Sequence, residues 1–217
     1  MKPSMQDRGV AVLMGAEACH GPALANGLAR AGFALAALPA GADAPSDPSR
    51  QSDGEVAVLV INAPVVRTGL AFDDITDAAF DAAMQEQVFD VVAAVQRMLP
   101  HMASGARMVL VGARGHLGAW GGAHRMAASA ALVALVRSLA LELAPAGIRV
   151  NLVAGDFVDA GAVETPDSEA IAHAVLFFAD PHCGVSGESM LLDGNAALRM
   201  SESRRPANAD RGASAST

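Results

Sequence analysis

Short apolar runs alternate along the chain with longer segments whose apolar residues recur at helical spacing. Runs of this length, bounded by Gly, Pro and polar residues, are typical of parallel strands that are buried on both faces. The longer segments predict helices, and prolines near residues 100 and 145 predict where two of them end. The expected strands are 10–14, 33–38, 56–61, 108–111, 148–153 and 190–192, and the expected helices are 21–31, 77–102, 127–144 and 168–179.

Strands that alternate with helices in this way predict an α/β fold, a Rossmann-like, doubly wound parallel sheet. The segment 39–54 is rich in Pro, Gly, Ala, Ser and Asp, which indicates a loop with no room for a further helix and strand. We therefore expect a shortened sheet in one domain over residues 1–200. The polar stretch 201–217 is expected to be a disordered tail.

Composition and charge narrow the possible functions. The chain has 217 residues, 52% of them hydrophobic, which is enough for one well-formed core. Its net charge of -8 and its scattered arginines offer no basic stripe for nucleic acid. The two cysteines, Cys19 and Cys183, match no metal-ligand spacing, so we expect no metal and a reducing compartment. The apolar runs are broken by charges and the first residues lack a signal peptide, which predicts a cytoplasmic protein without membrane contact.

Four segments, taken in order, resemble the short-chain dehydrogenase/reductase (SDR) family. They are AALVALVRSLALELA at 130–144, AGIRVN at 146–151, INAP at 61–64 and LLDGN at 191–195. The resemblance extends from about residue 10 to residue 195. It implies a Rossmann-type fold, a nicotinamide cofactor and a Ser-Tyr-Lys catalytic group assisted by an Asn.

The family's catalytic positions hold other residues in this chain. Alignment without gaps places Arg125 at the tyrosine, Ser129 at the lysine, Gly112 at the serine and Gln87 at the asparagine. The sequence contains no tyrosine, and Lys2 is its only lysine, so no other alignment restores the pair. The register shifted by one residue places Met126, Ala130 and Ala113 instead.

The family's phosphate-binding turn, TGxxxGxG, corresponds to MGAEACHG at 14–21. Gly15 and Gly21 remain, but Cys19 stands where the backbone must lie closest to phosphate, and Glu17 adds a negative charge. Asn62 is retained and is interpreted as a turn-forming residue. We expect no bound cofactor, with Gly15, Cys19, Gly21 and Asn62 as vestiges of the site. The short segment 156–167 leaves no room for the family's substrate lid.

The helices at 77–102 and 122–144 and the last strand near 190–194 keep the family pattern best. In the family these elements pair with the same elements of a neighbouring subunit. The main hypothesis is therefore a non-catalytic subunit, not an enzyme by itself, in a heterotetramer with an active SDR paralogue. That partner would oxidise or reduce a hydroxy or keto substrate, for example an acyl-CoA or a carrier-bound one, with NAD(P).

Two alternatives remain open. The first is a divergent enzyme without a nicotinamide cofactor, using a rebuilt site of His116, His124 and Arg125, with Glu17 and Arg114 nearby. The second is a regulatory protein that binds a small anion or an acyl-CoA in the remnant cleft. Thiolate chemistry at Cys19 and His20 is not expected, because adjacent residues in a turn seldom face one another.

Overall fold

The computed structural model describes residues 8–40, 55–163, 165 and 167–192. In this part of the chain six parallel strands form one sheet with the order β2-β1-β3-β4-β5-β6. The strands are β1 (Val10–Met14), β2 (Ala34–Leu38), β3 (Val56–Asn62), β4 (Met102–Ala113), β5 (Arg149–Gly155) and β6 (Ser189–Leu191). The α-helices are α1 (Gly21–Arg30), α2 (Asp77–Met84), α3 (Asp90–Met98), α4 (Ala123–Glu142) and α5 (Ser168–Ala179).

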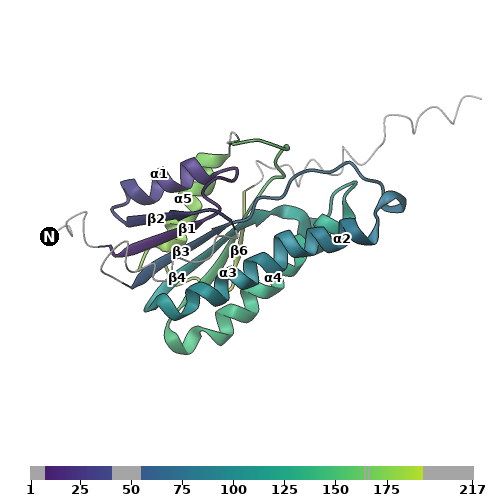
Figure 1. Ribbon diagram of the computed structural model, residues 1–217. Helices are drawn as coiled ribbons and strands as arrows, with labels where there is room; N and C mark the ends of the chain where they lie inside the picture. Colours follow the sequence, from purple (N-terminus) through teal and green to yellow (C-terminus); the bar gives the residue numbers. More distant parts are fainter. Residues whose placement is uncertain (1–7, 41–54, 164, 166, 193–217) are drawn as a thin grey trace, which may run out of the picture.

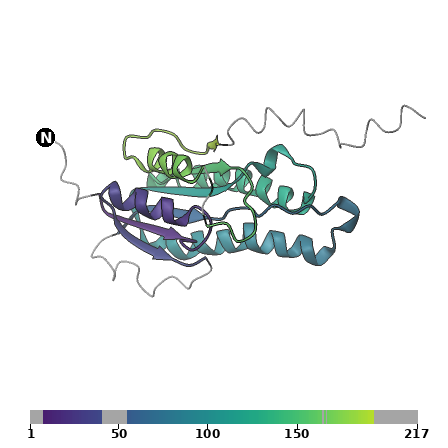
Figure 2. The ribbon, with the colours of Figure 1, turned by 90° about the horizontal axis from the view of Figure 1, so that it is seen from above.

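Helices cover both faces of the sheet, as Figures 1 and 2 show: α1 and α5 lie on one side, and α2, α3 and α4 on the other. The first strand illustrates why. Val12 and Met14 belong to the core cluster that includes residues of α3 and α4, whereas Leu13 belongs to the cluster that includes Leu24 and Phe178. Because neighbouring side chains of a strand point to opposite faces, an unbroken apolar run needs a helical layer on each side.

The helical layer that carries α2 and α3 contains one irregularity. Thr76 caps α2, its hydroxyl oxygen accepting a hydrogen bond from the Ala79 amide at 3.2 Å. Between α2 and α3, residues Gln85–Phe89 form a π-helical turn, a feature that is frequent at functional sites. This turn directs Gln87 into the protein, where only 3% of it is exposed.

The predicted fold is confirmed, with local differences. The expected helix 77–102 ends at Met98, because Pro100 cannot continue it, and the expected strand 108–111 begins earlier, at Met102. The sheet is shortened as expected, with β2 at one edge of its described part, and no helix lies between β5 and α5 in the described residues. The expected loop over 41–54, the boundary at residue 200 and the tail 201–217 lie outside the described residues.

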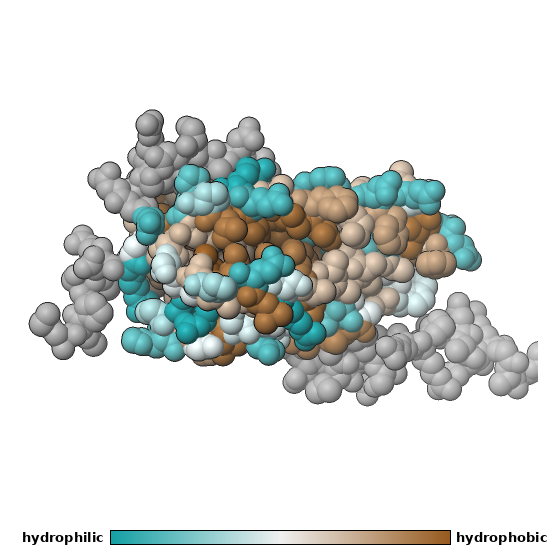
Figure 3. Space-filling view, turned by 90° about the horizontal axis from the view of Figure 1, so that it is seen from below, coloured by the Kyte–Doolittle hydropathy of each residue, from teal (hydrophilic) through white to brown (hydrophobic). Residues whose placement is uncertain are grey.

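Helix α4 presents an apolar surface on the outside of the molecule. Among the described helices, α4 alone is long and apolar enough to cross a membrane, but core helices of other proteins meet the same criterion. In this structure α4 packs on the sheet and on α2. Its outward side carries exposed Ala127, Ala130, Ala134 and Leu141. Figure 3, seen from the side of α3 and α4, shows apolar residues gathered along this layer.

Candidate functional site

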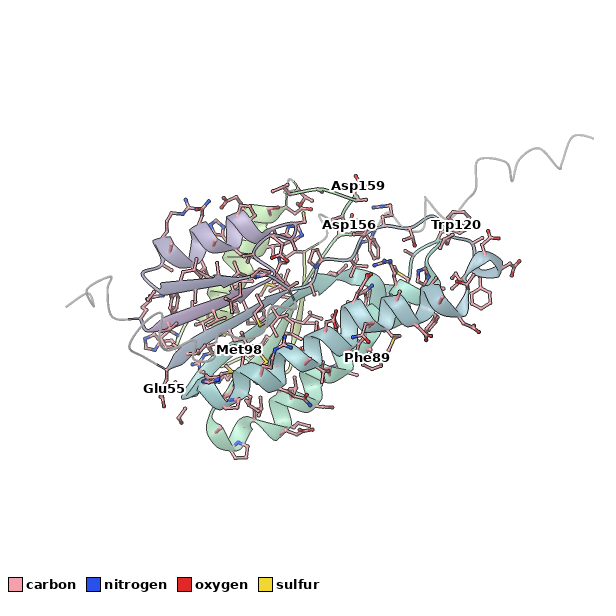
Figure 4. All side chains as sticks on the ribbon, viewed as in Figure 1. Glu55, Phe89, Met98, Trp120, Asp156 and Asp159 are labelled. Carbon is pink, nitrogen blue, oxygen red and sulfur yellow. The ribbon has the colours of Figure 1, made fainter. Side chains whose placement is uncertain are left out.

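A cavity of about 610 Å³ opens at the carboxyl ends of the strands. Ligands of doubly wound sheets bind at this edge. Residues from the turn after β1, the end of β3, the π-helical turn and the segment after β5 line the cavity. Figure 4 shows Asp156 and Asp159, from this last segment, above the strand ends.

The turn after β1 is held in one conformation by the end of β3. The Asn62 side-chain amide donates hydrogen bonds to the carbonyl oxygens of Gly15 and Cys19, both at 2.9 Å. Gly15 has a φ of +77°, and a Cβ there would collide with the Asn62 carbonyl oxygen. A Cβ on Gly21 would collide with the Ala16 carbonyl oxygen. Both glycines are therefore required by the turn itself, whatever it binds.

The turn does not offer the cradle that a dinucleotide phosphate needs. The amides of Gly15 and Ala16 donate to the Leu38 carbonyl, and the His20 amide donates to the Val163 carbonyl at 3.1 Å. Pro22, in the first turn of α1, has no amide hydrogen to give. Since these amides are already bonded within the protein and Pro22 offers none, a nicotinamide dinucleotide does not fit here in the usual manner.

The charges around the cavity oppose an anionic ligand as well. Among the described residues that line it, four are acidic and one, Arg125, is basic. A pyrophosphate brought among these carboxylates would be repelled at close range. The acidic residues are Glu17, Glu86, Asp90 and Asp159.

Three of the four family catalytic positions lie together beside this cavity. The Ser129 hydroxyl donates to the Gln87 side-chain oxygen at 3.3 Å, and the Arg125 guanidinium pairs with the Glu86 carboxylate at 3.2 Å. Gly112 lies apart from them, in β4, where a Cβ would touch the core leucines 132 and 152. A Cβ at Gly115 would collide with the Ser129 side chain, so the chain at residue 115 runs close beside it.

Glu86 is a site residue that the sequence did not indicate. Its pairing with Arg125 joins the π-helical turn to α4, two elements 39 residues apart in the chain. Only the tertiary packing of these helices places the two charges together. The Glu86 side chain is 57% exposed, so solvent screens the attraction.

The histidines expected in a rebuilt site lie elsewhere. His116 and His124 are not among the described residues that line the cavity, whereas Glu17 and Arg125 are. Burial lowers the pKa of each histidine, with Arg137 adding to the effect at His116 and Arg125 at His124. Arg114 forms an ion pair with Asp156 at 3.0 Å and packs over a phenylalanine ring, which is a structural arrangement.

Cys19 and His20, expected to face apart, face one another. The Cys19 sulfur lies 3.8 Å from His20 Nδ1, and the Ser168 hydroxyl lies 2.9 Å from the same nitrogen. Burial lowers the pKa of His20, and Asp167 raises it in part. The reason is the backbone: His20 has a φ of 76°, and this left-handed conformation turns its ring back toward the cysteine.

Comparisons with known proteins place this fold in a family. Residues 39–176 match the sequence model of a family described as Enoyl-(Acyl carrier protein) reductase. The chain is 29% identical over 168 residues to the (2S)-[(R)-hydroxy(phenyl)methyl]succinyl-CoA dehydrogenase subunit BbsD of Thauera aromatica, covering 67% of this chain and 66% of that one. It is also 29% identical over 182 residues to the 3-oxoacyl-[acyl-carrier-protein] reductase FabG of Escherichia coli, covering 72% of each.

A solved structure shows the same fold. The apo form of a short chain oxidoreductase from Pseudomonas aeruginosa, described as containing an atypical catalytic center, superposes with a TM-score of 0.75. The two chains are 22% identical, and the superposition covers 87% of this chain and 97% of that one.

These comparisons correct one expectation. The chain was expected not to be an enzyme by itself, but the matched family is described as a reductase, and the relatives are a dehydrogenase subunit and a reductase. The expectation rested on the missing tyrosine and lysine together with the altered phosphate-binding turn, and these replacements do not remove a chain from an enzyme class. The family match over residues 39–176, together with the six-stranded parallel sheet, shows that this chain belongs to the short-chain dehydrogenase/reductase family of oxidoreductases.

Proposed function

We propose that the protein is a subunit of an oligomeric SDR oxidoreductase that acts on a hydroxy or keto group of an acyl substrate carried on coenzyme A or a carrier protein. The substrate class follows from the two relatives, whose names contain succinyl-CoA and acyl-carrier-protein. The second chain of the oligomer is an SDR subunit with the Tyr-x-x-x-Lys pair, which this sequence does not contain. The expected location of the assembly is the cytoplasm.

The observation that carries this proposal is the outer face of the helical layer. Along α4 the exposed residues Ala127, Ala130, Ala134 and Leu141 recur at helical spacing, with Arg137 exposed between the last two, and Leu141 is 78% exposed. Phe89, at the end of the π-helical turn, is 54% exposed on the same layer (Figure 4). Small side chains let a partner helix approach closely. Burial of the exposed Phe and Leu side chains under that helix would stabilise the complex.

Native mass spectrometry of the full chain, alone and mixed with an SDR paralogue from the same host, tests the assembly. We expect a mixed tetramer with the paralogue. Ala134→Arg, in the middle of the α4 face, should abolish it, because an arginine there introduces bulk and charge into the contact. Ala29→Arg is the matched control, since Ala29 is exposed on α1, in the opposite helical layer. A homo-oligomer that ignores the paralogue, or an Ala134→Arg variant that still assembles, would refute the proposal.

A second candidate is an atypical catalytic centre of this chain itself. It is favoured by the Arg125–Glu86 pair at the cavity wall and by Gln87, whose buried side-chain nitrogen has no partner in the described part of the chain. A protein of the same fold is described as containing an atypical catalytic center. If this site takes part in turnover, Arg125→Met lowers kcat of the assembled enzyme while the mass of the complex stays unchanged. An unaltered kcat would exclude it.

A further inference from the structure

Cys19 stands at a position where three independent features favour a reactive thiol. It lines the cavity, its sulfur lies 3.8 Å from His20 Nδ1, and it precedes the amino terminus of a ten-residue helix, α1. Thiols beside a histidine and a helix amino terminus ionise readily, because the positive end of the helix dipole and the imidazole both stabilise a thiolate. No acidic residue lies in the first turn of α1 to oppose this effect.

The histidine is held in place for this contact. Its ring nitrogen contacts the Ser168 hydroxyl at 2.9 Å, and that oxygen in turn accepts a hydrogen bond from the Thr165 amide at 2.8 Å. His20 is also the one non-glycine residue with a positive φ in the described part of the chain. A left-handed conformation costs a residue with a Cβ about 1 kcal/mol. Strain of this kind is kept where the surrounding structure fixes a side chain, and such sites are often functional.

The charges near the sulfur are arranged unevenly. Burial lowers the pKa of His20, and Asp167, at the start of α5, offsets this in part, so the neutral ring that can accept a proton is favoured. Glu17, on the same turn, directs its carboxylate away and accepts a hydrogen bond from the Ala40 amide at 2.8 Å. The other charged groups of the cavity are Glu86, Asp90, Asp159 and Arg125. This acidic surround disfavours anionic reagents and leaves uncharged electrophiles as the suitable reactants.

We propose that Cys19 is a nucleophile that accepts the acyl group of a thioester whose uncharged end enters the cavity. His20 is the proton acceptor, and Ser168 positions the His20 ring. In the step, the Ser168 hydroxyl turns its hydrogen away from His20 Nδ1, the Cys19 proton passes to that nitrogen, and the sulfur attacks the thioester carbonyl carbon. A new carbon–sulfur bond forms, the bond to the departing thiol breaks, and His20 returns the proton to that thiol. The exchange needs no oxidant or metal.

The cavity suits an acyl group. Beyond Cys19, its walls include the apolar side chains of Ile61, Val91, Ala94 and Val163. Binding of an acyl chain against these walls is favourable, in proportion to the apolar area that is removed from water. The choice of a thioester as acyl donor rests on the proposed function, whereas the reactivity of Cys19 rests on the geometry of its own turn.

The first test measures thiol reactivity on the folded full chain. The sequence has two cysteines, and both are buried, so Cys183→Ser leaves Cys19 as the only thiol and Cys19→Ser leaves Cys183 as a control of similar burial. With iodoacetamide near neutral pH, we expect Cys19 to be alkylated about tenfold faster than Cys183. The midpoint of its pH–rate profile should lie below about 8.5, the value of a free thiol. A rate equal to that of Cys183, or a midpoint at the free-thiol value, would overturn the proposal.

Two variants test whether His20 raises the alkylation rate of Cys19, or whether the accessibility of the thiol alone determines it. His20→Asn, made in the Cys183→Ser background, removes the imidazole while supplying the side chain that best tolerates a positive φ after glycine. It should slow alkylation near neutral pH and return the midpoint to the free-thiol range. Ser168→Ala keeps the imidazole and removes its support, so it should give an intermediate rate. If circular dichroism shows both variants folded and neither changes the profile, His20 has no role.

The second test addresses acyl transfer. Incubation of the Cys183→Ser protein with S-acetyl-N-acetylcysteamine, an uncharged thioester, should add one acetyl group, found on the Cys19 peptide and removed by hydroxylamine. Alkylation without acetyl transfer would refute the acyl-acceptor role while leaving the reactive thiol. Because both tests use the isolated chain, failure of the helix pairing in the proposed function does not affect them.

Discussion

At the scale of single residues, Asn62 fixes the turn on which the candidate site depends. Its side-chain amide donates two hydrogen bonds, to the carbonyls of Gly15 and Cys19, and the side chain is 3% exposed. Asn62→Ala leaves both carbonyls without these donors in a buried place. We expect the free energy of unfolding to fall by about 2 to 3 kcal/mol, measured by urea denaturation at an unchanged m-value.

Asn151 provides the control for this prediction. It is equally buried, and its side chain bonds the Val185 carbonyl at 2.9 Å and the Glu188 amide at 3.1 Å, far from the turn. Asn151→Ala should therefore destabilise the fold without altering the alkylation rate of Cys19, whereas Asn62→Ala should change both. Identical alkylation rates in the two variants would show that Asn62 does not organise the turn.

The buried histidines make stability depend on pH. Burial lowers the pKa values of His20, His116 and His124 in the folded protein, so the unfolded chain binds protons first as the pH falls. Their contribution is complete above about pH 6.5, the unfolded value, and is lost as the pH drops below it toward the folded values. The free energy of unfolding should therefore decrease over this range, and less steeply in His124→Gln. If the free energy of unfolding falls equally steeply with pH in the unmodified protein and in His124→Gln, burial of His124 does not contribute to the pH dependence.

At the scale of elements, apolar pattern and chain breakers predicted most of the structure. The strand Val10–Met14 and the helix Ser168–Ala179 were predicted residue for residue, because unbroken apolar runs and helical spacing directly reflect burial. The helix predicted over 77–102 was wrong in its interior, where Gln85–Phe89 adopts a π-helical turn. No local signal marks that turn, which coincides with the bonding of Gln87 to Ser129 across the helical layer.

The candidate site was predicted only where it is local. Arg125 and Ser129, four residues apart on one helix, were expected to lie together, and they do, with Gln87 beside Ser129. The contact between His20 and Ser168 joins residues 148 positions apart and requires α5 to begin beside the turn after β1. Sequence spacing contains no information about such a contact. The orientation of His20 toward Cys19 also depends on a positive φ, which is uncommon for any residue other than glycine and is not marked by the sequence.

At the scale of the whole molecule, charge and backbone bonding together predict how the isolated chain responds to a dinucleotide. The chain has a net charge of -8, and the described residues that line its cavity include four acidic residues and one arginine. Three amides of its turn bond to Leu38 and Val163. A ligand that binds only the folded chain adds about 2.7 kcal/mol of stability when its concentration is about a hundredfold above Kd, and the melting temperature rises as a result. Titrating NADH or NADPH into the isolated chain should therefore leave its melting temperature unchanged, whereas a complex with an SDR paralogue should be stabilised through the paralogue. A saturable rise in the melting temperature of the isolated chain would show that its turn rearranges to release the bonded amides. In that case Glu17→Gln should strengthen dinucleotide binding, because it removes one of the repelling charges.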